Sequence, residues 1–183
     1  MPFAFYIFPH LHQILKRTVQ MKQKKVVLKT DGAMTFQYPL PPFLKGVVSQ
    51  RGYCMWLMNK GENLRRRDIK LNRPYSKVNS ETVYNQKVHQ AVLDGGEFDP
   101  FTGEKLNWGL VSKEKNMETA SYTNDYLNTY ALYPVVDHTN PEEFEFEICS
   151  LISNECKSSL TPDEFVDFCQ RVVDFRGVTT PAA

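Results

Sequence analysis

The chain has 183 residues, enough for one domain with a substantial core and barely enough for two. With 42% hydrophobic and 23% charged residues its composition is globular, which excludes a disordered chain, a collagen-like chain and a coiled coil. The formal net charge is +1, yet residues 1–92 hold 16 basic and 4 acidic side chains, and residues 93–183 hold 6 and 17. This division indicates either a basic face for a polyanion beside an acidic, metal-binding region, or two oppositely charged faces that attract each other.

The first twenty residues stand apart from the rest of the pattern. Leu11, Ile14 and Leu15 fall at helical spacing, which favours an amphipathic helix; alternatively, translation starts at Met21 and the segment is dispensable. Its basic residues follow the apolar run, whereas a secretory signal places them before it. No apolar stretch reaches the ~20 residues that a membrane span needs. We therefore expect a cytoplasmic protein without a membrane partner.

Residues 21–97 are predicted to form a basic, mainly helical part. Residues 26–28 are a candidate strand. Apolar residues at helical spacing predict a helix over residues 53–71, and Gly61 leaves open whether this helix is continuous. The most basic stretch of this helix is either an ordinary solvated face or a phosphate-binding surface. We expect it to contact the DNA backbone through Arg65, Arg66, Arg67 and Lys70.

Two further helices carry start signals in the sequence. Ser80 is suited to cap a helix over residues 81–93. Residues 161–164, Thr-Pro-Asp-Glu, form a capping box with proline at the first helical position, and the apolar residues after it repeat at helical spacing. Residues 113–125 are polar and predict a loop, and residues 177–183 predict a frayed tail.

One part of the acidic half contains the pattern most typical of a catalytic site. A short apolar strand is predicted to end at Asp137 and His138, and residues 144–149 alternate as a half-buried strand does. Asn154 follows, with Lys157 three residues later. This order resembles the His-Asn-His (HNH, ββα-metal) endonuclease family, in which an Asp-His pair ends one strand of a hairpin and an Asn lies on the helix packed beneath it.

The resemblance covers roughly residues 98–172, within a predicted HNH-like core of residues 98–176, and more faintly residues 56–57 and 65–68. It implies an α+β fold with a ββα-metal core. Many members carry an upstream zinc knuckle written around C-x-x-C-G. Here residues 99–103, Asp-Pro-Phe-Thr-Gly, keep the Thr-Gly end and lack the cysteines. We therefore expect no structural zinc, and hydrogen bonds or apolar packing in its place. The family's polar residue that orients the base would fall near Glu145.

The resemblance also assigns roles to individual residues. His138 would be the general base that activates water, and Asp137 and Asn154 would hold one divalent cation, Mg²⁺ or Mn²⁺. Lys157 would screen phosphate charge. The implied function is metal-dependent hydrolysis of DNA phosphodiester bonds. DNA is then the partner, and the oligomeric state is left open.

Each of these residues also has a structural interpretation. The Asp of an Asp-His pair at a strand end often accepts a hydrogen bond from the ring, and Asn154 is equally suited to cap a helix. His89 is interpreted as exposed or as a DNA contact. If these structural interpretations hold, the chain is a non-catalytic nucleic-acid-binding module on a decayed HNH scaffold, or a protein-interaction domain whose acidic half binds a basic partner. With no C-x-x-C pair, the cysteines are interpreted as small buried residues: Cys54, Cys149, Cys156 and Cys169.

Overall fold

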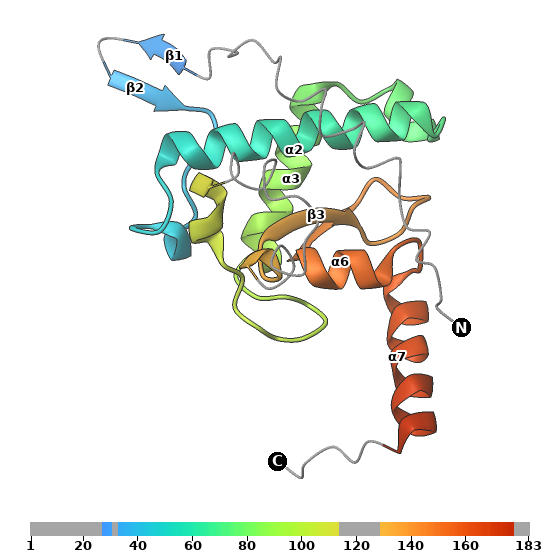
Figure 1. Ribbon diagram of the computed structural model, residues 1–183. Helices are drawn as coiled ribbons and strands as arrows, with labels where there is room; N and C mark the ends of the chain where they lie inside the picture. The colour runs from blue at the N-terminus through green and yellow to red at the C-terminus, as the bar shows by residue number, and fades with distance from the viewer. Residues whose placement is uncertain (1–26, 31–32, 114–128, 178–183) are drawn as a thin grey trace. The chain divides into compact units, whose positions relative to one another are not determined.

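The structure is a computed structural model that describes residues 27–30, 33–113 and 129–177 (Figure 1). The predicted N-terminal segment, nearly all of the predicted loop over residues 113–125 and the tail after Gly177 lie outside these ranges. The chain divides into two compact units, Met1–Gln37 and Tyr38–Ala183. Each unit is described by itself below.

The described part of the first unit is a β-hairpin. Strand β1, Val27–Thr30, pairs antiparallel with strand β2, Ala33–Phe36, in a register that places Val27 opposite Phe36. The predicted strand at residues 26–28 is confirmed over its last two residues. Its partner escaped prediction because the four residues Ala-Met-Thr-Phe carry little strand preference on their own.

The second unit combines α-helices, short 3-10 helices and one antiparallel pair of strands, which confirms the predicted α+β class. None of the helices among the described residues is long and apolar enough to span a membrane. The elements in chain order are η1 (Pro42–Leu44), α2 (Gln50–Lys70), η2 (Pro74–Lys77), α3 (Glu81–Gly95), η3 (Trp108–Lys113), β3 (Pro134–His138), β4 (Phe146–Ser150), α6 (Leu151–Lys157) and α7 (Pro162–Arg176).

Helix α2 is continuous through Gly61 and packs directly on α3. Gly61 is buried at this contact, and a methyl group in its place would overlap the side chain of Asn85 on α3. The missing side chain therefore lets the two helices approach each other closely. The Ser80 hydroxyl accepts a hydrogen bond from the backbone N–H of Val83, so the predicted cap of α3 is confirmed.

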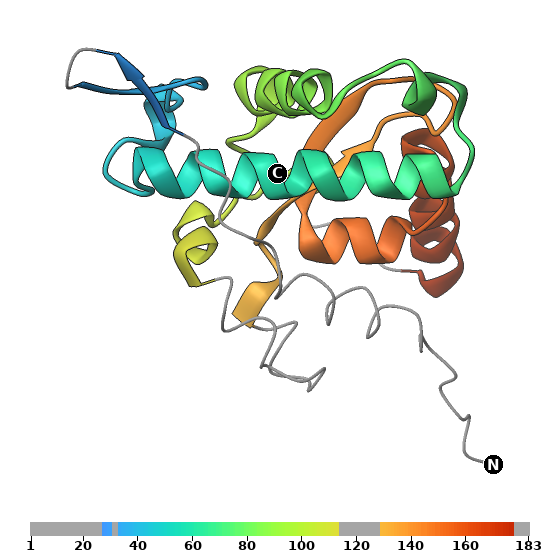
Figure 2. The ribbon, with the colours of Figure 1, turned by 90° about the horizontal axis from the view of Figure 1, so that it is seen from above.

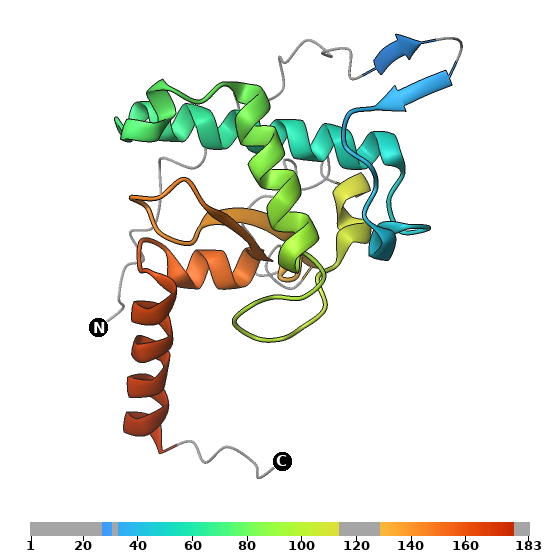
Figure 3. The same cartoon turned by 180° about the vertical axis from the view of Figure 1, so that it is seen from behind.

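Strands β3 and β4 form a hairpin that lies between α2 and α6 (Figures 1 and 3), and α2 extends across it (Figure 2). The register places His138 opposite Phe146 and Asp137 opposite Glu147. Neighbouring residues of a strand point to opposite faces. His138 consequently faces α2 and α3, while Asp137 faces α6. Helix α3 packs on β4 on the His138 side.

The turn over residues 99–103 is closed by the carboxylate of Asp99, which is 1% exposed. Its Oδ1 accepts hydrogen bonds from the backbone N–H groups of Phe101 and Thr102, each at 2.9 Å. Its Oδ2 accepts one from the N–H of Ser150 at 2.6 Å, which ties the turn to the end of β4. Gly103 has φ +70°, a conformation that glycine adopts without strain. Hydrogen bonds thus close the turn, as the sequence predicted.

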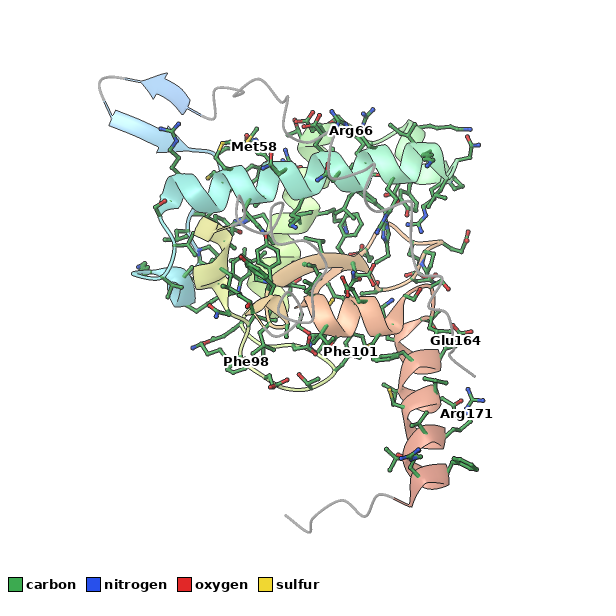
Figure 4. All side chains as sticks on the ribbon, viewed as in Figure 1. Met58, Arg66, Phe98, Phe101, Glu164 and Arg171 are labelled. Carbon is green, nitrogen blue, oxygen red and sulfur yellow. The ribbon has the colours of Figure 1, made fainter. Side chains whose placement is uncertain are left out.

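Helix α7 begins with the predicted capping box, in which Thr161 and Glu164 bond each other's backbone N–H groups. Phe165 is its buried residue, and its ring meets that of Phe101 edge to face at 5.3 Å between centroids. Figure 4 shows Phe101 near the start of this helix. The helix predicted from the apolar spacing is present, and apart from Phe165 the residues with this spacing are exposed: Phe168, Cys169, Val172 and Val173.

Aromatic side chains fill the space between α2, α3 and η3. The rings of Trp56 and Trp108 meet edge to face at 4.8 Å between centroids, and the indole N–H of Trp108 donates to the carbonyl of Gly96 at 2.7 Å. His89 belongs to this cluster, because its Nδ1 lies 2.7 Å from the hydroxyl of Tyr53. It is therefore a half-buried packing residue of this cluster, and the exposed role predicted for it is wrong.

The four cysteines divide into two pairs by burial. Cys54 and Cys149 are buried, as predicted for small apolar residues. Cys156 and Cys169 are exposed, which the sequence did not predict. Cys156 lies beside the buried Lys157 on α6, and one step along a helix turns a side chain by about 100°, to a different face.

Candidate functional site

The end of β3 brings Asp137 and His138 next to the last turn of α2. Both residues are nearly buried, at 7% and 3% exposure. Arg67 on α2 reaches both of them: its Nη2 lies 2.6 Å from Nδ1 of His138 and 3.9 Å from Oδ1 of Asp137. Because neighbouring residues of a strand point to opposite faces, the side chains of Asp137 and His138 point away from each other. The guanidinium of Arg67 contacts both of them.

The partners of His138 determine which of its ring nitrogens carries the hydrogen. A guanidinium stays protonated and has no acceptor, so Arg67 donates and Nδ1 accepts. The ring hydrogen is then on Nε2, which donates to Oδ2 of Asp68 at 3.2 Å. Burial lowers the pKa of His138 and the charge of Arg67 lowers it further, while the hydrogen bond to Asp68 opposes them. The ring is therefore neutral near pH 7, the form that a general base requires.

Asp68 lies fully buried at the centre of a hydrogen-bond network. Its Oδ2 also accepts from the hydroxyl of Tyr84 at 2.9 Å, and its Oδ1 accepts from Nη1 of Arg73 at 3.0 Å. Burial raises the pKa of Asp68, but the hydrogen bonds of His138 and Tyr84 and the charge of Arg73 together bring it below its usual value. The carboxylate is thus charged and fixed, and it orients the imidazole.

On the opposite face of the hairpin, Asp137 forms an ion pair with Lys157 of α6. The Nζ of Lys157 lies 2.8 Å from Oδ2 of Asp137, and the side chains are 4% and 10% exposed. The ammonium also donates to the carbonyl of Leu160 at 2.8 Å. The sequence placed Lys157 among the phosphate contacts, whereas the structure buries it against a carboxylate.

Glu147 lies opposite Asp137 in the hairpin register and was not singled out in the sequence. Its Oε1 is buried and has no hydrogen-bond partner among the described residues. Burial raises the pKa of Glu147 and the neighbouring Asp137 raises it further, while Lys157 lowers it. One ammonium thus acts on two carboxylates of this face.

Asn154 lies within α6, one turn before Lys157. The cap of this helix is Ser150, whose hydroxyl accepts from the N–H of Ser153 at 3.1 Å, so the alternative of Asn154 as a cap is wrong. Among the described residues no hydrogen bond joins the side chain of Asn154 to Asp137 or His138, and no group of three or more His, Cys, Asp or Glu side chains could hold a metal ion. In this arrangement the ammonium of Lys157 lies against Asp137, one of the two predicted metal ligands.

The four predicted phosphate contacts on α2 point in different directions. Arg65 is half-buried, with its Nε donating to the carbonyl of Asn79 at 3.2 Å. Arg66 lies on the side of α2 turned away from β3 (Figure 4) and pairs with Glu62 at 2.7 Å. Arg67 and Lys70 are exposed in the last turn of the helix. Arg67 is therefore the predicted contact that joins the surface to the buried His138.

Sequence reasoning missed the residue that orients His138. The family pattern placed it near Glu145, but Glu145 forms an ion pair with Lys87 of α3. Asp68 takes this role from 70 positions earlier in the chain. The signal available in the sequence was a lone acidic residue, Asp68, directly after the three arginines of a predicted helix.

The fold and the site together define an α+β unit with a buried carboxylate–imidazole pair beside a half-exposed arginine. Comparisons of the chain with known protein families, with curated proteins and with solved structures found no match. The assignment of a function therefore depends on the geometry of these side chains.

Proposed function

We propose that the chain binds the phosphodiester backbone of nucleic acid and hydrolyses it, with His138 as the general base. One observation carries the proposal: Asp68 holds a neutral imidazole whose accepting Nδ1 is turned toward the guanidinium of Arg67. The side chain of Arg67 is 45% exposed, so this base lies directly behind a cation that a phosphate can reach. An arginine fork suits two oxygens of one phosphate.

The charges of the cluster also favour an anionic ligand. Two carboxylates, Asp68 and Asp137, contact three cations: Arg67, Arg73 and Lys157. Glu147 is a third carboxylate of the cluster, and it acts on Lys157 as well. Arg67 is the most exposed of the three cations, at 45% against 16% for Arg73 and 4% for Lys157, so its positive charge is the one that an anion from solvent meets.

The order of elements is the one that the HNH resemblance implies. The hairpin of β3 and β4 is followed directly by α6, which packs against both strands. Asp137 and His138 end the first of these strands. A ββα-metal core is part of this proposal, with the departure that a lysine of α6 sits on Asp137.

The proposed reaction begins when a phosphate group draws the guanidinium of Arg67 onto its oxygens and so frees the lone pair of His138 Nδ1. A water molecule attacks phosphorus while its proton passes to Nδ1. The bond from phosphorus to the ester oxygen of the nucleic acid breaks, and that oxygen leaves with the electron pair and takes a proton from solvent. Asp68 acts as a positioning residue, because it fixes the ring and stabilises the imidazolium that forms.

The test is cleavage of supercoiled plasmid DNA and of a labelled single strand by the purified full chain, with Mg²⁺, with Mn²⁺ and with EDTA. His138→Ala is expected to lower the rate by ~10²–10⁴-fold, the usual contribution of a positioned base. Asp68→Asn should lower the rate while leaving nucleic-acid affinity unchanged. His89→Gln is the matched control, since it removes a half-buried histidine that packs against Tyr53 in the aromatic cluster. Equal cleavage by the wild type and His138→Ala would refute the base.

A second function, non-catalytic nucleic-acid binding, is favoured by one observation. The guanidinium of Arg67 occupies the accepting nitrogen of His138, so the base is blocked until Arg67 moves. A binding module predicts salt-dependent affinity for DNA and no cleavage under any of these conditions. A protein-interaction domain predicts no salt-dependent DNA binding at all. The same purified protein therefore separates the three functions.

A further inference from the structure

We infer that the ammonium of Lys157 is the resident cation of Asp137, where the HNH resemblance places a divalent metal ion, and that hydrolysis at this site needs no divalent cation. The statement about the cation stands on the geometry of α6 and the hairpin alone. The statement about hydrolysis rests on the proposed function. The two parts are tested by separate measurements below.

Lys157 is fixed in this position from two sides. Its Nζ lies 2.8 Å from Oδ2 of Asp137 and donates to the carbonyl of Leu160, also at 2.8 Å. Leu160 follows Ser158, which ends α6 with φ +53°, so the chain turns back over the ammonium. A lysine side chain that is 4% exposed, ion-paired with Asp137 on one side and hydrogen-bonded to Leu160 on the other, is part of the interior of the site and does not act as a surface cation.

A divalent ion at Asp137 would have to compete with two side-chain cations. Mg²⁺ requires near-octahedral oxygen ligands at about 2.0–2.1 Å. Oδ2 of Asp137 already faces the ammonium of Lys157, and Oδ1 faces the guanidinium of Arg67 at 3.9 Å. A metal ion on Oδ2 would therefore lie next to a like charge that is held in place, and a metal ion on Oδ1 would lie beside the positive charge of Arg67.

The ion pair between Asp137 and Lys157 also explains why Arg67 is available to a ligand from solvent. Asp137 lies between the buried ammonium and the half-exposed guanidinium, and it attracts both. With Lys157 neutralising most of its charge, Asp137 holds Arg67 loosely, at 3.9 Å, and leaves the guanidinium free to accept a phosphate. The cation that meets the phosphodiester is then Arg67, and Asp137 is a positioning residue that binds no metal.

The cation is tested by titrating the full chain with Mn²⁺ alone and following free Mn²⁺ by electron paramagnetic resonance. The wild type is expected to bind no Mn²⁺ up to about 1 mM, a weak-site concentration. Lys157→Met keeps most of the stem, removes the charge and leaves Asp137 and Glu147 without their cation. This variant should gain Mn²⁺ affinity by at least about tenfold. Lys105→Met is the matched control, since it removes an exposed lysine with the same change in net charge and should gain nothing.

The outcomes separate the inference from the proposed function. Mn²⁺ binding by the wild type below about 100 μM, abolished in Asp137→Asn, would overturn the inference whether or not any DNA is cut. This titration uses the wild type and Asp137→Asn, so it tests the inference even if Lys157→Met does not fold. Circular dichroism would show whether that variant folds. Cleavage of DNA that persists in EDTA supports the second part, and cleavage that EDTA abolishes overturns it. Failure to cut DNA under every condition refutes the proposed function and leaves the Mn²⁺ result to decide the cation.

Discussion

Replacing Asp99 with alanine is expected to destabilise the second unit more than any single substitution on its surface. The carboxylate is 1% exposed and accepts three backbone hydrogen bonds, from Phe101, Thr102 and Ser150. The third of these joins the turn to the fully buried end of β4, next to the start of α6. Its loss leaves the N–H of Ser150 without a partner in a place that water does not readily reach.

The magnitude follows from the number and kind of these bonds. A hydrogen bond to a charged group contributes about 1.5–3 kcal/mol, and a buried donor left without a partner costs about 1–3 kcal/mol. Phe101 and Thr102 lie at the surface of the turn, where water replaces part of what they lose. We therefore expect Asp99→Ala to lower the free energy of unfolding by about 3–5 kcal/mol, a large share of the ~5–15 kcal/mol of a typical domain.

Urea denaturation followed by circular dichroism measures this loss. Asp99→Asn keeps one accepting oxygen and should fall between the wild type and Asp99→Ala. Glu104→Ala is the control, because this exposed residue lies in the same turn and should change stability by less than about 0.5 kcal/mol. A loss below about 1 kcal/mol in Asp99→Ala would refute the view that this carboxylate replaces a knuckle metal.

Three further measurements probe the packing, the charge state and the surface of the molecule. Gly61→Ala should lower the free energy of unfolding by about 1–2 kcal/mol, because overpacking against α3 exceeds the gain in helix propensity. Gly95→Ala, whose new methyl group would meet no atom within 4 Å, should lower it by nothing. Equal melting temperatures of the two variants would contradict this prediction. Burial lowers the folded-state pKa of His138, so its contribution to stability is complete above about pH 6.5 and is lost as pH falls toward the lowered value. The wild type should therefore lose more melting temperature than His138→Gln between about pH 7 and pH 5.5. Arg66→Ala and Lys70→Ala should each reduce the salt dependence of DNA affinity by about one unit of slope, measured by fluorescence anisotropy, and an unchanged slope would exclude these residues as phosphate contacts.

Features set by neighbouring residues were predictable from the sequence. The caps at Ser80 and Thr161 are local devices, in which a side chain bonds a backbone group three residues away, and both are present. The strand ending at Asp137 and His138 follows from a run of apolar residues. A tight turn over residues 99–103 was likewise expected, and Asp99 and Gly103 form it with hydrogen bonds and a positive φ.

Features set by distant residues were not predictable in this way. The pairing of His138 with Asp68 depends on how α2 packs across the hairpin, and no periodic pattern in either segment carries that information. The continuity of α2 through Gly61 has the same origin, since a glycine that weakens a helix by itself is favoured where a second helix must approach closely. Asp137 was interpreted as a metal ligand because the HNH resemblance gives that role to the residue beside the base histidine, while its lysine partner was assigned to phosphate.

The charge asymmetry of the sequence allowed two interpretations, and the structure contains elements of both. Among the described residues, two ion pairs between an arginine or lysine of the basic half and a carboxylate of the acidic half are Arg67 with Asp137 and Lys87 with Glu145. The halves thus attract each other within one unit, as the second interpretation predicted. Lys157, however, neutralises Asp137 from within the acidic half, and this leaves Arg67 incompletely paired at the surface. An acidic residue that already carries a lysine cannot also neutralise an arginine fully, so Arg67 retains positive charge at the surface, and in the proposed function this charge meets the phosphate.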